Sequence, residues 1–306
     1  MYIIGENIHI ISQRVKEAIA ERDIKFFQDL AVKQVEAGAD ALDLNIGPQK
    51  KTGHEIMPWL VKGVQEVVDV PLSLDTTNLA AIEEGLKVAK GQCIINSSSA
   101  EDERLATVPP LAKKYDAKLI ALTMGKGGIP VSAEERVNIG LEKLIPRAME
   151  LDMPMEDLLI DPLVLTVSGC QEYCPECVEA VRILKLAGDP PPMTNVGLSN
   201  VSNAVPREMR PLINRTYCVM LMAAGVDYAI ADPLDEQLKD FIRIVNERDD
   251  STGVAKLLLT LYDKTAAMDK LTADDVDMGD PGQVDILKTV QILYNDVIYT
   301  DSYLRV

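Results

Sequence analysis

The strongest constraint on the fold is an alternation of short apolar segments with longer amphipathic segments along the chain. Eight segments have the composition of buried strands, at residues 2–8, 40–47, 70–78, 92–99, 118–124, 158–165, 194–200 and 227–233. The intervening segments have apolar residues at helical spacing, as in 24–38, where Gly38 is placed to end a helix. Because strands separated by helices pair in parallel, eight such units predict a (β/α)8 TIM barrel, a single domain over residues 1–306. A doubly wound open sheet is the alternative, although no glycine-rich phosphate loop follows the first segment.

One segment near the C-terminus departs from this repeat. Residues 249–284 contain an amphipathic stretch and an acidic stretch, TADDVDMGDPGQ, before a helical pattern resumes at 284–298. We interpret 249–284 as a helical insertion in the eighth helical region, on the outside of the barrel. Two roles are open for it: packing on its own barrel, or dimerisation and partner docking.

The charge and composition of the chain exclude several kinds of partner and location. The formal net charge is −17 at pH 7. Duplex nucleic acids and anionic membrane surfaces require clustered cations, so we expect neither as a partner. No apolar run approaches the roughly 20 residues of a membrane span, and the N-terminus lacks the basic and apolar regions of a signal peptide. With five cysteines, an odd number, we expect a cytoplasmic protein with reduced thiols.

Acidic and carboxamide side chains occur at or near the C-terminal ends of the predicted strands. They are Glu6, Asp43, Asn45, Asp75, Asn96, Asp161, Asn200 and Asp232. A single Asp or Asn in this position is often a helix N-cap, and Asp75 fits that interpretation. Asn200 could likewise be the residue that turns the chain. In a barrel, however, the ends of all strands meet at one mouth, so we predict an active site there.

The residue types offer little support for metal or nucleophilic chemistry. Cys170, Cys174 and Cys177 have the C-x3-C-x2-C spacing of iron–sulfur and radical S-adenosylmethionine sites, but the motif follows the sixth strand instead of the first. The chain has two histidines, His9 and His54, and no G-x-S-x-G elbow. We expect no protein-bound metal and interpret the cysteines as reduced loop residues. A mouth of carboxylates and carboxamides suits a neutral heterocycle rich in N–H donors, such as a pterin or a guanine.

Seven short motifs occur in order along the chain: LDLNIG (42–47), SLDTTN (73–78), INSSS (95–99), ALTM (121–124), LIDPL (159–163), GLSNVS (197–202) and RPLINRTY (210–217). Together they resemble the pterin-binding methyltransferases, and among these the methyltetrahydrofolate:corrinoid protein methyltransferases. The resemblance covers roughly residues 1–248 and 285–306. Dihydropteroate synthases share the fold, but their Asn-Val-Thr-Pro-Asp-Ser-Phe and Arg-x-His motifs are absent here.

The resemblance implies a dihydropteroate-synthase-like barrel that moves a methyl group between N5 of tetrahydrofolate and cobalt. The cobalt belongs to cobalamin carried by a separate, transiently bound corrinoid protein, and the direction of transfer is open. The positions that match the pterin-holding residues of the family are Asp75, Asn96 and Asp161. We also expect folate contacts from Glu6, Asp43, Asn203 and Arg210. Barrels of this family are generally homodimers, which we expect here too.

Asn200 matches the family residue that hydrogen-bonds near N5. A tertiary amine is a poor leaving group, so attack by Co(I) on the methyl group requires N5 to be protonated or nearly so. An amide does not titrate near neutral pH, but it can accept from N5–H or donate to the N5 lone pair, and so stabilise developing charge. We expect the proton to come from solvent through a network that includes Asp161. Two alternatives remain open: a non-catalytic folate- or pterin-binding protein, and a dihydropteroate-synthase-like enzyme.

Overall fold

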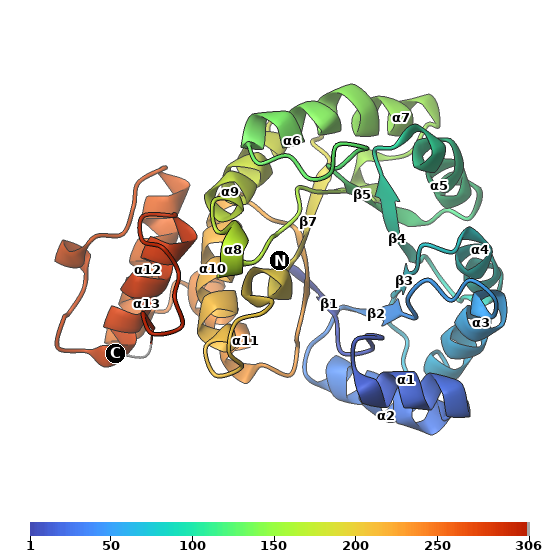
Figure 1. Ribbon diagram of the computed structural model, residues 1–306, viewed down its shortest axis with the longest axis horizontal. Helices are drawn as coiled ribbons and strands as arrows, with labels where there is room; N and C mark the ends of the chain where they lie inside the picture. Colours follow the sequence, from blue (N-terminus) through green and yellow to red (C-terminus); the bar gives the residue numbers. More distant parts are fainter. Residues whose placement is uncertain (305–306) are drawn as a thin grey trace.

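Eight parallel strands close into a barrel in sequence order (Figure 1). The structure is a computed structural model that describes residues 1–304. The strands are β1 (Tyr2–Gly5), β2 (Ala41–Asn45), β3 (Leu72–Asp75), β4 (Ile94–Ser99), β5 (Lys118–Leu122), β6 (Leu158–Asp161), β7 (Met193–Gly197) and β8 (Tyr228–Ala231). Since β1 pairs with both β2 and β8, the predicted barrel is confirmed and the open sheet is wrong.

Helices connect successive strands and surround the barrel. They are α1 (Gln13–Glu21), α2 (Ile24–Glu36), α3 (Gly53–Val64), α4 (Leu79–Val88), α5 (Asp102–Lys114), α6 (Ala133–Ile139), α7 (Ile145–Glu150), α8 (Val167–Cys170), α9 (Tyr173–Leu184), α10 (Arg210–Ala224), α11 (Glu236–Glu247), α12 (Gly253–Ala266) and α13 (Pro281–Leu293). Short turns of other helix types are η1 (Gly140–Leu144), η2 (Met155–Asp157), η3 (Leu198–Ser202) and η4 (Ala273–Asp275). The predicted helix end is confirmed, because Gly38 follows α2 with a left-handed φ of 98°. None of the helices in residues 1–304 is long and apolar enough to cross a membrane.

Several strands end earlier than the sequence pattern predicts. The predicted segment 158–165, for example, contains β6, which ends at Asp161. Pro162 follows directly and has no N–H to continue the hydrogen-bond ladder. The residues beyond such an end belong to loops at the mouth of the barrel, where functional residues of this fold are usually found.

The inside of the barrel has two layers of different chemistry. One buried cluster is apolar and contains Ile4, Ala41, Ile94, Ile120 and Leu159. Because side chains alternate along a strand, residues two positions further also face inward. Four of those positions are polar: Glu6, Asp43, Asn96 and Asp161. The apolar layer therefore closes the barrel beneath a polar layer at the carboxyl ends of the strands.

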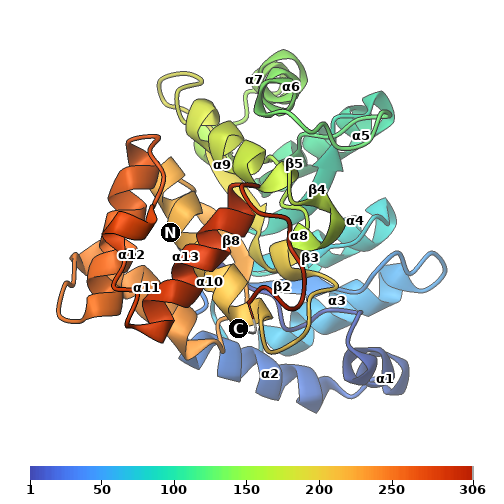
Figure 2. The ribbon, with the colours of Figure 1, turned by 60° about the vertical axis from the view of Figure 1, so that its left-hand side comes forward.

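The segment after α11 packs on the outside of its own barrel. Both α12 and α13 contact α10, and α12 also contacts α11. Figure 2 shows these helices side by side, outside the ring of strands. Leu258 and Leu261 are fully buried in a cluster that includes Val219 and Tyr217 of α10. Of the two roles left open for 249–284, the structure therefore shows packing on the barrel.

Candidate active site

We call the group of Asp43, Asp75, Asn96 and Asp161 the floor of the mouth. One of its carboxylates, Asp43, is buried and accepts two hydrogen bonds on one oxygen. Asp43 Oδ1 accepts from Ser73 Oγ at 2.6 Å and from Asn96 Nδ2 at 3.1 Å. All three side chains come from neighbouring strands, β2, β3 and β4. Asp43 Oδ2 and Asn96 Oδ1 have no hydrogen-bond partner within residues 1–304. Two acceptors are thus free on this part of the floor.

Asp75 belongs to the same group and is not a helix cap. It is the last residue of β3, aligned with Asn45 of β2 and Asn96 of β4. Its Oδ2 accepts from Asn45 Nδ2. The cap of α4 is Asn78, whose Oδ1 accepts from the N–H groups of Ala80 and Ala81. The N-cap interpretation of Asp75 is therefore wrong, and the predicted place of this carboxylate in the mouth is what the structure shows.

Asp161 is buried at the end of β6 beside an amide that the sequence interpretation missed. Asp161 Oδ1 accepts from the N–H of Leu163 at 2.8 Å, and Oδ2 accepts from Asn195 Nδ2 at 2.7 Å. Asn195 is fully buried, and its Oδ1 has no hydrogen-bond partner among the described residues. The alternation of β7 could have identified Asn195 as inward-facing, but the polar end of the segment favoured Asn200.

Burial raises the pKa of each carboxyl group on this floor. The pKa of Asp43 and of Asp161 rises to about 6, in each case through burial that exceeds the opposing effect of hydrogen bonds. Burial also raises the pKa of Asp75 well above its ordinary value, and the charge of Asp43 adds to this. The floor is therefore rich in acceptors and poor in donors. A ligand that brings N–H donors would favour the ionised carboxylates.

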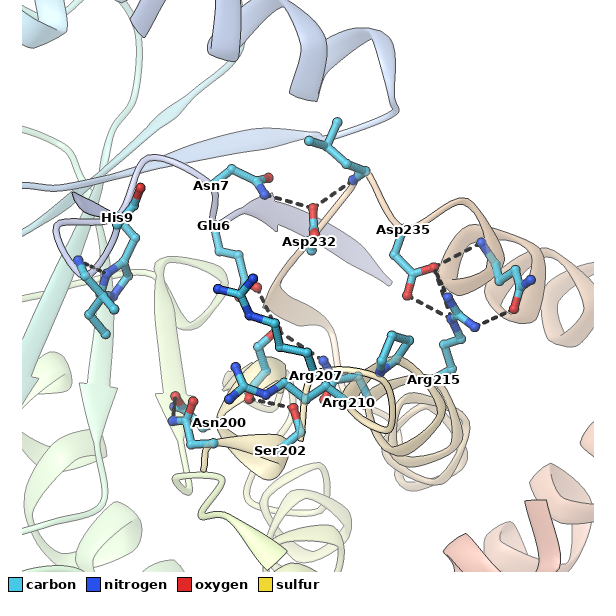
Figure 3. Close-up of a pocket in the computed structure, with 18 of the residues that line it drawn as sticks. Glu6, Asn7, His9, Asn200, Ser202, Arg207, Arg210, Arg215, Asp232 and Asp235 are labelled. Atoms are coloured by element: carbon cyan, nitrogen blue, oxygen red, sulfur yellow. Dashed lines mark hydrogen bonds and ion pairs between the residues drawn. The ribbon is translucent and has the colours of Figure 1, made fainter. Parts of the chain in front are cut away.

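A cavity of about 880 Å³ opens at the mouth above β1, β7 and β8 (Figure 3). Among the predicted site residues, it is lined by Glu6, Asn200, Asn203 and Arg210. The predicted residues on the floor, which are Asp43, Asp75, Asn96 and Asp161, do not line it. Glu6 links the two groups: burial raises its pKa, and the charges of Asp232 at the cavity and of Asp43 on the floor add to the rise.

Asn200 is not at the end of a strand, which corrects the sequence interpretation. The strand β7 ends at Gly197, and the chain continues as the 3-10 turn η3 because Leu198 and Val201 are buried on the barrel. The Asn200 side chain is exposed at the edge of the cavity, and its Oδ1 accepts from Asn203 Nδ2 at 3.2 Å. An amide in this position is accessible to a ligand without breaking a buried contact.

Three arginine side chains line the outer cavity together with several acidic side chains. Arg210 Nε donates to the carbonyl of Val205 at 2.7 Å, and Arg215 is paired with Asp235. Arg207 is exposed, and within the described part of the chain its guanidinium has no hydrogen-bond or ion-pair partner. This part of the cavity suits an anionic group of a ligand.

The three cysteines singled out in the sequence lie on the helices after β6, so their interpretation as loop residues is wrong. Cys174 and Cys177 are buried in α9, and Cys170 ends α8. Burial raises the pKa of Cys177 to about 12 and that of Cys174 further, so both are thiols at neutral pH. Over residues 1–304 no group of three or more His, Cys, Asp or Glu side chains is arranged to hold a metal ion.

The raised pKa of Asp161 predicts a pH-dependent stability that Asp161→Asn removes. Below about pH 3 the carboxyl is protonated in both the folded and the unfolded chain. As pH rises to about 6, the unfolded chain ionises first, so the folded protein loses stability. The loss from this one group is about 3 kcal/mol. In the variant, Asn195 Oδ1 can accept from the introduced amide once Asn195 rotates.

The measurement is the free energy of unfolding in urea between pH 3 and pH 7, in the absence of ligand. We expect the stability of Asp161→Asn relative to the unsubstituted protein to increase by about 3 kcal/mol over this range. Parallel pH profiles for the two proteins would show that the Asp161 pKa is not raised.

Comparisons with known proteins agree with this geometry. A sequence from Eubacterium limosum, "Methylcorrinoid:tetrahydrofolate methyltransferase", is 29% identical over 244 residues, covering 78% of this chain and 87% of that protein. The methionine synthase of Mycobacterium leprae is 28% identical over 238 residues, covering 74% of this chain but 20% of that protein.

Solved structures of dihydropteroate synthases have the same fold. The enzyme of Thermus thermophilus aligns with a TM-score of 0.58 at 19% identity, over 81% of this chain and 92% of that one. The enzyme of Yersinia pestis aligns with a TM-score of 0.58 at 16% identity, over 81% and 94%. The sequence pattern of the pterin binding enzyme family matches residues 12–232, from the N-cap of α1 to the residue after β8. Since this match includes nearly the whole barrel and most of its mouth, the chain belongs to the pterin binding enzyme family.

Proposed function

We propose that this barrel transfers a methyl group between N5 of tetrahydrofolate and the cobalt of a corrinoid carried by a partner protein. The observation that carries the proposal is the acceptor-rich floor, at a mouth that also carries the exposed amide of Asn200. The similarity to the methylcorrinoid:tetrahydrofolate methyltransferase of Eubacterium limosum supports this reaction over others of the family.

The floor fits the donor edge of a pterin ring. The exocyclic amino group and the ring N–H of a pterin are adjacent donors, and a carboxylate can accept from two parallel donors. Asp75 and Asp161 would accept from this edge, while the free oxygens of Asn96 and Asn195 offer further acceptors. Binding of such donors would offset the burial that raises the pKa of these carboxyl groups.

The outer cavity has room for the rest of the substrate and for the second reactant. Its volume of about 880 Å³ is larger than a pterin ring needs. Arg207 and Arg210 would face the carboxylates of the folate glutamate, and the mouth would remain open to the corrinoid. We propose that the corrinoid protein docks transiently, because its cobalt must also react elsewhere. The homodimer expected from the resemblance stays a prediction that analytical ultracentrifugation can check.

Asn200 would act on N5 without titrating. When N5 loses its methyl group, the electron pair of the broken C–N bond stays on N5, and the amide can donate to it or accept from N5–H. The same side chain serves the reverse reaction, in which N5 attacks a methyl group. The corrinoid supplies the cobalt that accepts or gives the methyl group, while the barrel supplies position and electrostatic stabilisation.

The test is methyl transfer with free cobalamin, run in both directions. We expect 5-methyltetrahydrofolate to methylate cob(I)alamin, and methylcobalamin to methylate tetrahydrofolate, each followed by its visible spectrum. Folate binding in calorimetry without transfer in either direction would reject the enzyme and leave a folate-binding protein. Formation of dihydropteroate from a pterin diphosphate and p-aminobenzoate would instead support the dihydropteroate-synthase-like alternative.

A further inference from the structure

The Glu6 carboxyl group is held by the hydroxyl of Ser199, the residue before Asn200. Glu6 follows β1 directly, and its backbone N–H donates to the carbonyl of Ala231 at 3.1 Å, which fixes the residue to the barrel. Its Oε1 accepts from Ser199 Oγ at 2.6 Å. Ser199 immediately precedes Asn200 on η3, and all three of these side chains line the same cavity. Glu6 and the amide assigned to N5 are therefore parts of one structural unit.

The direction of the hydrogen bonds determines which atom of Glu6 is free. Asn214 Nδ2 donates to Ser199 Oγ over a long distance of 3.5 Å. Ser199 has a single proton, and it is directed to Glu6 Oε1. Glu6 Oε2 has no partner within residues 1–304, so this oxygen is available to hold a proton and exchange it with a ligand in the cavity.

Burial and the charges around Glu6 favour its protonated form. The pKa of Glu6 is raised to about 7, mainly by burial; the bond from Ser199 lowers it, and the charges of Asp232 and Asp43 add to the rise. Burial lowers the pKa of His9, so this residue is neutral at pH 7. The other charged side chains that line the cavity are Arg207, Arg210, Arg215, Asp235 and Glu236.

We propose that Glu6 exchanges the proton of N5 during methyl transfer, and that Ser199 positions its carboxyl group beside Asn200. This inference rests on the proposed function. When the methyl group leaves for Co(I), the C–N bond breaks, its electron pair remains on N5, and the proton of Glu6 moves to N5. The resulting carboxylate regains a proton from solvent through the open cavity. In the reverse direction, N5 attacks the methyl group and its proton moves to Glu6.

The sequence interpretation gave Asp161 a part in the proton network. The structure makes Asp161 less suited to this exchange than Glu6. Both of its oxygens already accept hydrogen bonds from the protein, and it does not line the cavity. We therefore assign Asp161 to pterin binding and the proton exchange to Glu6.

The experiment measures the pH dependence of kcat/KM for methyl transfer from 5-methyltetrahydrofolate to free cob(I)alamin. For the unsubstituted protein we expect kcat/KM to fall as pH rises through about 7, because the protonated form of Glu6 is required. In Glu6→Gln we expect a loss of about two orders of magnitude below that pH and no falling limb. Folate affinity, measured by calorimetry, is expected to stay close to that of the unsubstituted protein.

Two further variants separate proton exchange from a structural role. Ser199→Ala removes the bond that lowers the pKa of Glu6, so the falling limb is expected at higher pH. Asp232→Asn removes a charge that raises this pKa, so the limb is expected at lower pH. Structural damage would not move the limb in opposite directions, and these variants remain informative even if Glu6→Gln does not fold.

The failure of this inference is distinguishable from the failure of the proposed function. If the unsubstituted protein transfers no methyl group at any pH, the proposed function is rejected and the role of Glu6 falls with it. If it transfers the methyl group and Glu6→Gln keeps the same falling limb, only the role of Glu6 is rejected. Unshifted limbs in both Ser199→Ala and Asp232→Asn would reject it as well.

Discussion

Asn200→Ala is expected to lower the rate of methyl transfer by about two orders of magnitude, with little change in folate affinity. The amide is assigned to the developing charge at N5, so its loss acts on the transition state more than on the bound substrate. The side chain is exposed, and in the part of the chain that the structure describes its only side-chain hydrogen bond is with Asn203. The truncation therefore leaves no buried group without a partner. Single-turnover reaction with cob(I)alamin, followed by its spectrum, measures the effect.

A matched control is Asn246→Ala. Asn246 is also exposed, but it lies near the C-terminal end of α11 and does not line the cavity. We expect unchanged rate and affinity in this control. If Asn200→Ala reacts as fast as the control, the role assigned to Asn200 is wrong.

Asp75→Asn is expected to weaken tetrahydrofolate binding by about two orders of magnitude, on the order of 3 kcal/mol. The substitution replaces an acceptor of a pterin N–H with a side chain that also carries donors. Burial disfavours the charged form of Asp75 in the free protein, so removal of the charge should not destabilise the fold. Binding and folding effects are thus separated, and calorimetric titration with tetrahydrofolate measures the first of them.

Asp157→Asn serves as the control for this variant. Asp157 is also buried, but it immediately precedes β6 at the opposite end of the barrel, where it accepts from Lys118 Nζ at 2.7 Å. We expect folate affinity to be unchanged there. Equal affinities for Asp75→Asn and Asp157→Asn would mean that Asp75 does not hold the pterin.

The strand positions of the site could be predicted well from the sequence. The segment 70–78 predicted a strand with Asp75 near its end, and the structure ends β3 at that residue. The segment 92–99 similarly placed Asn96 inside β4, next to Asp75 in register. These predictions succeed because side-chain alternation along a strand depends mainly on nearby residues.

The β7 region shows where the sequence pattern was insufficient. Both Asn195 and Asn200 lie in or near the predicted strand 194–200, and the pattern favoured the second as the strand end. In the structure, the first is buried against Asp161 and the second lies on a separate turn. A short apolar run followed by polar residues does not reveal whether the chain continues as a strand or turns, since Leu198 and Val201 can be buried either way.

The sequence by itself determined the alternation of strands and helices, hence the closed barrel, and the polar character of its mouth. Those properties follow from local periodicity and from the need of parallel strands for helical connections. Only the tertiary structure decided which polar groups lie in contact with one another. Glu6 and Ser199 are separated by 193 positions in the chain and meet because β8 pairs with β1 and closes the barrel. The raised pKa values have the same origin, because burial of a carboxyl group depends on everything packed around it and not on its neighbours in sequence.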